Sequence, residues 1–199
     1  MERKFLKKIS YRLRIGIIGK KEPLKEIFLE NLRNSAIESN LSDDFYEFLL
    51  VFKQIPIKIK IYLYDTVENL IYDFDNIQKL DIIILTLNLS EPDSLSSINK
   101  QLIEEFNEIF SFQGISVLVG MNFEHIFNRT SSKKFKISRF QLEKITKDLN
   151  LIYCFEIFNK NRDVNEIYNT LFNDFILRFQ FSSPELFKTA KEYGKRLLI

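Results

Sequence analysis

The chain alternates short apolar runs with longer segments in which apolar residues recur every three or four positions. Short apolar runs are typical of strands, and the wider spacing is typical of amphipathic helices. The runs predict six strands: Leu13–Ile18, Phe45–Phe52, Ile57–Tyr64, Ile82–Leu89, Ser116–Gly120 and Leu151–Phe155. The helical spacing covers five segments: Pro23–Ser39, Val67–Gln78, Leu95–Phe110, Ser138–Leu149 and Asp163–Phe181. This alternation predicts an α/β fold with a doubly wound, six-stranded and mostly parallel sheet.

One pair of strands interrupts the alternation. Only the four residues Lys53–Pro56 separate the second strand from the third, which is too short for a helical crossover. We therefore expect these two strands to form an antiparallel hairpin, while the other strands run parallel.

A further helix is expected at the C-terminus, where Ser183 suits an N-cap and Pro184 a first turn. Its apolar residues share one face: Leu186, Phe187, Ala190, Tyr193 and Leu197. An amphipathic face needs a surface to cover, and we expect that surface to be the parent domain, with a partner groove or a bilayer interface as alternatives. The predicted organisation is a basic N-terminal extension (1–10), one domain (11–181) and this helix (182–199).

Composition narrows the classes of function. The 29 basic and 27 acidic residues leave a net charge of +2, which argues against bulk nucleic-acid binding. Cys154 is the single cysteine, so a disulfide framework is excluded, and its apolar surroundings predict a core thiol. No apolar run reaches the roughly 20 residues of a membrane span. We expect a cytoplasmic protein, with weak contact to an anionic membrane through the basic stretch Glu2–Ile9 as an alternative to a solvated lead-in.

The segment after the first predicted strand has the spacing of a phosphate-binding loop, G-x-x-x-x-G-K-[ST]. Gly19 and Lys25 occupy the first Gly and the Lys of that pattern. Leu24 stands in place of the second Gly, and Glu26 in place of the hydroxyl residue that holds Mg²⁺. A Cβ at position 24 hinders close approach of the backbone to phosphate, and a carboxylate at position 26 repels it.

Three further motifs follow in order. Asp65-Thr66-Val67-Glu68-Asn69, after the third strand, is similar to D-T-A-G-Q, and Met121-Asn122-Phe123-Glu124, after the fifth, falls where N-K-x-D is expected. Phe155-Glu156-Ile157-Phe158-Asn159-Lys160 is similar to E-T-S-A-K. With the phosphate-loop spacing, these motifs resemble the Ras-like small GTPases from about Tyr11 to Phe181.

The resemblance implies a Ras-like G-domain and a nucleotide site at the matching positions. The residues implied to bind nucleotide are Gly19, Lys25, Asp65, Thr66, Asn122, Glu124 and Lys160. Asp65 would also hold Mg²⁺ if the ion binds, and Asn69 takes the position that orients the attacking water. No catalytic residue is assigned beyond that position.

The substitutions at every motif favour a pseudo-GTPase, with no cofactor, that acts as a scaffold or adaptor in signalling or trafficking. Its expected partner is a protein, such as another GTPase-like subunit. The alternative is a genuine switch that binds GTP or GDP with Mg²⁺ and hydrolyses GTP weakly with a partner's help. A receiver-type fold is less suitable, because it needs an acidic pair where Gly19-Lys20-Lys21 stands. His125, the only histidine, has no histidine or cysteine partner for zinc and is interpreted as a loop residue.

Overall fold

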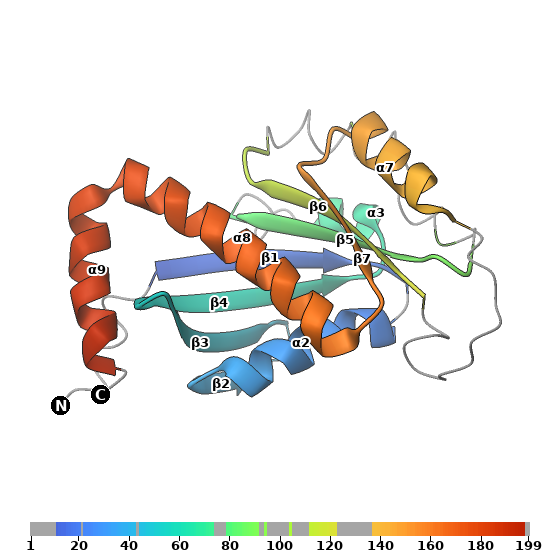
Figure 1. Ribbon diagram of the computed structural model, residues 1–199. Helices are drawn as coiled ribbons and strands as arrows, with labels where there is room; N and C mark the ends of the chain where they lie inside the picture. Colours follow the sequence, from blue (N-terminus) through green and yellow to red (C-terminus); the bar gives the residue numbers. More distant parts are fainter. Residues whose placement is uncertain are drawn as a thin grey trace.

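A computed structural model describes residues 11–20, 22–42, 44–73, 79–91, 94, 104, 112–122 and 137–197 (Figure 1). The strands are β1 (Tyr11–Ile18), β2 (Glu38–Leu41), β3 (Tyr46–Phe52), β4 (Ile55–Tyr64), β5 (Ile82–Asn88), β6 (Ile115–Met121) and β7 (Tyr153–Ile157). The helices within the described residues are α2 (Glu22–Ser35), α3 (Val67–Tyr72), α7 (Arg139–Asp148), α8 (Lys160–Ser182) and α9 (Pro184–Leu197).

All seven strands form one mixed sheet in the order β2-β3-β4-β1-β5-β6-β7. β1 lies in the middle and pairs in parallel with both β4 and β5. β5, β6 and β7 continue in parallel, whereas β3 is antiparallel to β4. The prediction of an α/β fold with a mostly parallel sheet and an antiparallel β3–β4 hairpin is confirmed, while β2 adds a second antiparallel pairing that was not predicted.

Helices cover both faces of the sheet, as a doubly wound fold requires (Figure 1). One core joins alternate residues of β1 to α2 and α8, and its central members are Leu13, Ile15, Ile17, Phe28 and Leu171. A second core on the opposite face contains Ile18, Val67, Leu85, Leu118 and Leu142, with contributions from α3 and α7. The second half of β1, from Ile15 to Ile18, is therefore buried on both sides, which explains why its apolar residues are continuous there, whereas Arg12 and Arg14 alternate with Leu13 in the first half.

The prediction of six strands is wrong by one, because part of the first predicted helix is a strand. α2 ends at Ser35 instead of Ser39, and Glu38–Leu41 forms β2 at the edge of the sheet. β2 pairs antiparallel with β3, so that Asn40 lies opposite Glu47. All four residues of β2 are exposed, and the backbone pairing with β3 overrides the helical spacing of the side chains.

Two other predicted helices differ in extent: α3, and α8, which runs from Lys160 to Ser182 instead of from Asp163 to Phe181. α3 ends at Tyr72 rather than Gln78, with Asp73 as its C-cap donating its N–H to the carbonyl of Leu70. Most of the predicted helix Leu95–Phe110 and the whole extension 1–10 lie outside the described residues. The helix predicted over Ser138–Leu149 is confirmed as α7, with Ser138 as its N-cap in a capping box with Gln141.

The β3–β4 hairpin is tighter than the predicted four-residue connection. Lys53 and Gln54 alone form the turn, and both have positive φ, at 48° and 68°. Positive φ at both central positions is the type I′ pattern that suits the twist of a hairpin. Neither residue is a glycine or asparagine, so the turn carries a backbone cost that the surrounding packing must offset.

The amphipathic helix α9 packs on its parent domain, at the amino end of β4 (Figure 1). Ala190 is buried in the α2/α8 core and Phe187 packs edge-on against Phe179 of α8. Leu186 differs from the prediction, since it is exposed. Gly194 faces the hairpin turn so closely that a Cβ there would lie 1.8 Å from the carbonyl oxygen of Gln54. Within the described part of the chain, no helix is both long and apolar enough to cross a bilayer.

Replacing Gly194 with alanine is expected to destabilise the protein by about 2 kcal/mol, because the added methyl group meets backbone atoms that cannot move aside. This loss exceeds the gain of up to about 1 kcal/mol in helix propensity from glycine to alanine. Urea denaturation followed by circular dichroism measures the change. Lys195→Ala, in the same helix but exposed, is the control and should shift stability by less than about 0.5 kcal/mol. An unchanged midpoint for Gly194→Ala would show that α9 does not dock on the turn.

Candidate functional site

The candidate site lies at the carboxyl ends of the parallel strands. The chain leaves β1 toward the β4 side of the sheet and leaves β5 toward the β6 side, so the strand order reverses between β1 and β5. In open α/β sheets, ligands bind outside the carboxyl ends of the strands at such a point. The described residues that the resemblance selects all follow these strand ends or the helices after them: Gly19, Lys25, Asp65, Thr66, Asn69, Asn122 and Lys160. Glu124 and His125 lie outside the described residues.

Gly19 is required by the close approach of β1 to β5. A Cβ at this position would lie 1.9 Å from the hydroxyl oxygen of Thr86. That hydroxyl donates a hydrogen bond of 2.9 Å to the carbonyl of Ile18, and the N–H of Gly19 donates to the carbonyl of Tyr64. Packing within the sheet thus explains the glycine without a phosphate ligand.

The connection from β1 to α2 is short. β1 ends at Ile18 and α2 begins at Glu22, so only three residues lie between them. Leu24 is already in the first turn of the helix, with a side chain that is 1% exposed. Pro23 contributes no N–H to this turn. The region therefore offers fewer backbone donors than the long glycine loop that cradles phosphates in P-loop proteins.

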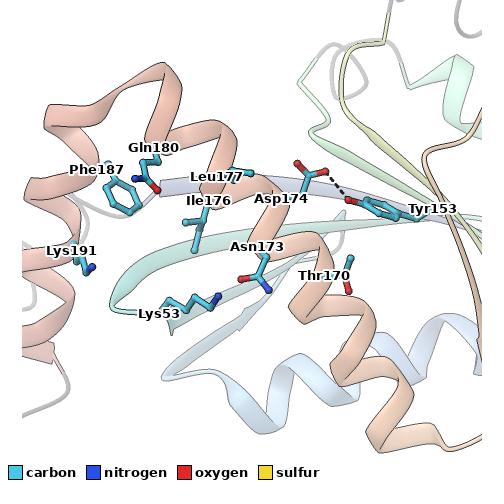
Figure 2. Close-up of a pocket in the computed structure, with 10 residues that line it drawn as sticks. All are labelled: Lys53, Tyr153, Thr170, Asn173, Asp174, Ile176, Leu177, Gln180, Phe187 and Lys191. Atoms are coloured by element: carbon cyan, nitrogen blue, oxygen red, sulfur yellow. Dashed lines mark hydrogen bonds between the residues drawn. The ribbon is translucent and has the colours of Figure 1, made fainter.

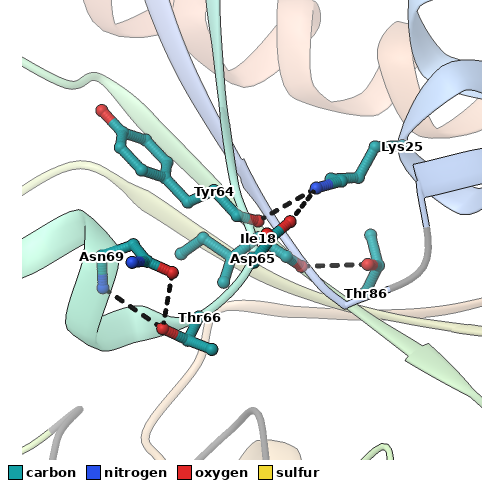
Figure 3. A network of polar contacts seen from close by, with 7 residues as sticks. All are labelled: Ile18, Lys25, Tyr64, Asp65, Thr66, Asn69 and Thr86. Atoms are coloured by element: carbon teal, nitrogen blue, oxygen red, sulfur yellow. Dashed lines mark hydrogen bonds and ion pairs between the residues drawn. The ribbon is translucent and has the colours of Figure 1, made fainter.

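The most unusual group of the site is the buried side chain of Lys25 (Figure 3). Side chains of a helix lean toward its N-terminus, which carries Lys25 from α2 to the end of β4. Its Nζ lies 2.6 Å from Oδ1 of Asp65 and 3.5 Å from the carbonyl oxygen of Tyr64. Lys25 is 1% exposed, whereas the side chain of Asp65 is 69% exposed. A buried ammonium is thus neutralised by a carboxylate at the surface.

Thr66 and Asn69 serve the local structure of α3. Thr66 is the N-cap of this helix, and its hydroxyl oxygen accepts the N–H of Asn69 at 3.2 Å. The same hydroxyl donates to the side-chain oxygen of Asn69 at 2.9 Å (Figure 3). Asn69, at the position that orients water in the resemblance, is therefore engaged in a helix cap.

Asn122 belongs to a buried polar network beyond β5 and β6. Its side-chain oxygen accepts a hydrogen bond of 2.9 Å from the hydroxyl of Ser90. The N–H of Ser90 in turn donates to the side-chain oxygen of Asn88, and Ser94 donates to the Asn88 carbonyl. Asn88, Ser90 and Asn122 are all at least nine-tenths buried. The network fastens the loop after β5 to the end of β6.

Lys160, at the start of α8, forms an ion pair with Glu30 of α2. Next to it, Asp163 satisfies the end of β7 and the helix N-terminus: Oδ2 accepts the N–H groups of Phe158 and Asn159, each at 2.7 Å. Burial acts to raise the pKa of Asp163, but these two N–H donors and the guanidinium of Arg162 outweigh it and lower the pKa below its usual value.

The surroundings of the Asp65 carboxylate suit an ammonium group better than a Mg²⁺ ion. Magnesium requires several oxygen ligands in near-octahedral arrangement. Oδ1 of Asp65 already accepts the Lys25 ammonium, and Glu26, at the position of the Mg²⁺-binding hydroxyl, lies 3.7 Å from the guanidinium of Arg33. Across the ranges that the structure describes, no three His, Cys, Asp or Glu side chains are grouped as a metal site.

Sequence reasoning did not identify four residues that shape this region: Glu30, Thr86, Ser90 and Asp163. Asp163 had a detectable signal, since an acidic residue in the first turn of a helix suits its N-terminus. The others act through contacts with residues far away in sequence.

A scan against models of protein families finds none that matches this chain, and a search of curated proteins finds no matching relative.

We expect Asp65→Asn to destabilise the fold by about 1–3 kcal/mol, because it removes the carboxylate that lies 2.6 Å from the buried Lys25 ammonium. Lys25→Met removes the buried charge while keeping an unbranched chain, so it should restore stability in the double variant. Urea denaturation of the wild type, both single variants and the double variant measures the coupling. A double variant less stable than Asp65→Asn would contradict a pair of this kind.

Asp163 should make stability depend on acid pH. Its pKa is lower in the folded state than in the unfolded chain, so its contribution is fully present above the usual Asp pKa of about 3.9 and is lost as the pH falls through the folded value. Asp163→Asn should therefore be less stable than the wild type at neutral pH, and the difference should shrink below about pH 4. Thermal unfolding from pH 7 to pH 3 measures it. A constant difference across this range would mean that the carboxylate charge has no role.

Proposed function

We propose that this protein is a pseudo-GTPase: a Ras-like fold that acts as a scaffold or adaptor through protein contacts, without relying on bound guanine nucleotide. Support for the fold comes from the central position of β1, with the antiparallel hairpin on one side and the later parallel strands on the other. The matched motifs fall in order at the carboxyl ends of these strands. Motifs at the carboxyl ends of the strands are expected if the chain descends from a nucleotide-binding protein.

The observation that carries the proposal is the pairing of Lys25 with Asp65 at 2.6 Å. In an active P-loop the lysine meets the outer phosphates of the nucleotide. Here the ammonium already has a carboxylate and the Tyr64 carbonyl within reach, so a phosphate would have to displace them. The short β1–α2 connection and the buried Leu24 provide little backbone to offset that exchange.

The partner in this proposal is another protein, for example a second GTPase-like subunit. Loss of nucleotide chemistry places no constraint on the outer faces of the helices, which remain available for contact. The proposal also includes a weak contact between the basic N-terminal extension and the surface of an anionic membrane.

The alternative is a GTP-binding switch whose site is completed by a partner. The retention of Lys25 and Asp65 side by side at the switch point of the sheet favours this alternative. It requires nucleotide to break the ion pair, with Mg²⁺ taking over Asp65.

Calorimetric titration with GDP and GTP, with and without Mg²⁺, distinguishes the two. Before the titration, a separate aliquot of the purified protein is denatured, and any guanine nucleotide that it releases is quantified by chromatography. We expect no stoichiometric nucleotide and no saturable binding, because the phosphate-binding lysine is engaged within the protein. Lys25→Met and the matched surface variant Lys188→Met should behave like the wild type. Micromolar binding that is lost in Lys25→Met and kept in Lys188→Met would overturn the proposal and establish the switch.

A further inference from the structure

A trough of about 600 Å³ crosses the outer face of α8, away from the carboxyl ends of the strands (Figure 2). Its floor is the exposed side of α8, including Asn173, Leu177 and Gln180. Lys53 of the hairpin turn and Lys191 of α9 stand along one flank, and Tyr153 of β7 stands at the other end. The hairpin turn, β7 and the consecutive helices α8 and α9 thus build one surface.

The two lysines of the trough differ from Lys188 and Lys195 in having no ion-pair contact among the described residues. Lys188 is paired with Glu185, and Lys195 with Glu192, both along α9. Over the part of the chain that the structure describes, Lys53 and Lys191 form neither an ion pair nor a hydrogen bond. Two cations without an ion-pair contact in the described part of the chain therefore border the same trough, and Lys191 has only the longer-range attraction of Glu192.

The position of Lys53 is held by the fold. Lys53 occupies the left-handed region, at φ 48°, where glycine or asparagine is usual. The turn that carries it is clamped by α9, whose Gly194 lies directly against Gln54. Lys191 is one helical turn before Gly194, so the same contact positions both lysines. The cations are preorganised on rigid elements, which lowers the entropic cost of binding.

The remainder of the trough suits a peptide more than a small ion. Leu177 is 52% exposed and Phe187 adds part of an aromatic ring, while Asn173 and Gln180 present amides that can bond a peptide backbone. The one carboxylate in the lining is Asp174, which is paired with Arg178 and accepts the Tyr153 hydroxyl at 3.2 Å. Asp174 is thus compensated, and the positive charge of the lysines dominates.

We propose that this trough is a docking site for an acidic segment of a partner protein, in which Asp or Glu residues alternate with apolar ones. The acidic groups pair with Lys53 and Lys191, and an apolar side chain covers Leu177. The charge complementarity favours an acidic protein segment, and the apolar floor and amides distinguish it from a free anion. This inference does not depend on whether the carboxyl-end site binds nucleotide.

Fluorescence anisotropy with two labelled peptides tests the proposal. One peptide alternates Glu with Leu, and the other has the same length with Lys in place of every Glu. The wild type should bind the acidic peptide and not the basic one, and binding should weaken as salt is raised. Lys53→Gln/Lys191→Gln should weaken binding by about tenfold, which corresponds to about 1.4 kcal/mol. Lys188→Gln/Lys195→Gln removes the same charge from α9 and should change binding less than about twofold.

Circular dichroism confirms that both double variants are folded. Failure of the wild type to bind the acidic peptide, or equal losses in the two double variants, would overturn the proposal. Sedimentation with phosphatidylserine vesicles provides a second arm. Retention on vesicles that depends on Lys53 and Lys191, without peptide binding, would overturn the protein partner in favour of a membrane surface.

Discussion

The close approach of Gly19 to Thr86 determines the geometry on which the candidate site depends. The Thr86 hydroxyl holds the carbonyl of Ile18, so the end of β1 is fixed against β5. Only three residues then separate β1 from α2, and Lys25 enters the first turns of the helix within reach of the end of β4. A side chain at position 19 would push β1 and β5 apart and move the start of α2. The ion pair between the buried Lys25 and the exposed Asp65 is thus a consequence of how two strands pack.

α8 connects the two surfaces of interest. Its first turn borders the carboxyl ends of the strands, where Lys160 pairs with Glu30 and Asp163 holds the end of β7. Its second half forms the floor of the trough and contacts α9. The inward side of the same helix is buried throughout, from Val164 to Phe179. Because the helix is anchored along its whole length, the two surfaces are held at fixed positions without sharing residues.

Sequence patterns predicted the elements whose side chains are buried. They did not predict structure that depends on backbone pairing or on contacts between residues distant in the sequence. The apolar run of β5 was recognisable because both of its faces are covered, and β1 and β4 were recognisable because their buried apolar residues recur at every second position or closer. β2 was missed because its four residues are exposed and its partner strand alone makes it extended. The spacing of the sequence motifs correctly placed Gly19, Lys25 and Asp65 at the carboxyl edge of the parallel strands. It gave no sign that Lys25 and Asp65 would bind each other, since 40 residues separate them.

The extra strand β2 alters the border of the sheet. Without it, β3 would be the outermost strand and would expose the backbone groups of seven residues. β2 covers part of that strand with a segment of only four residues that includes Glu38, Ser39 and Asn40. Short, polar edge strands are poor templates for pairing with another chain. The strand that replaced the end of a predicted helix therefore acts as a barrier to edge-to-edge aggregation.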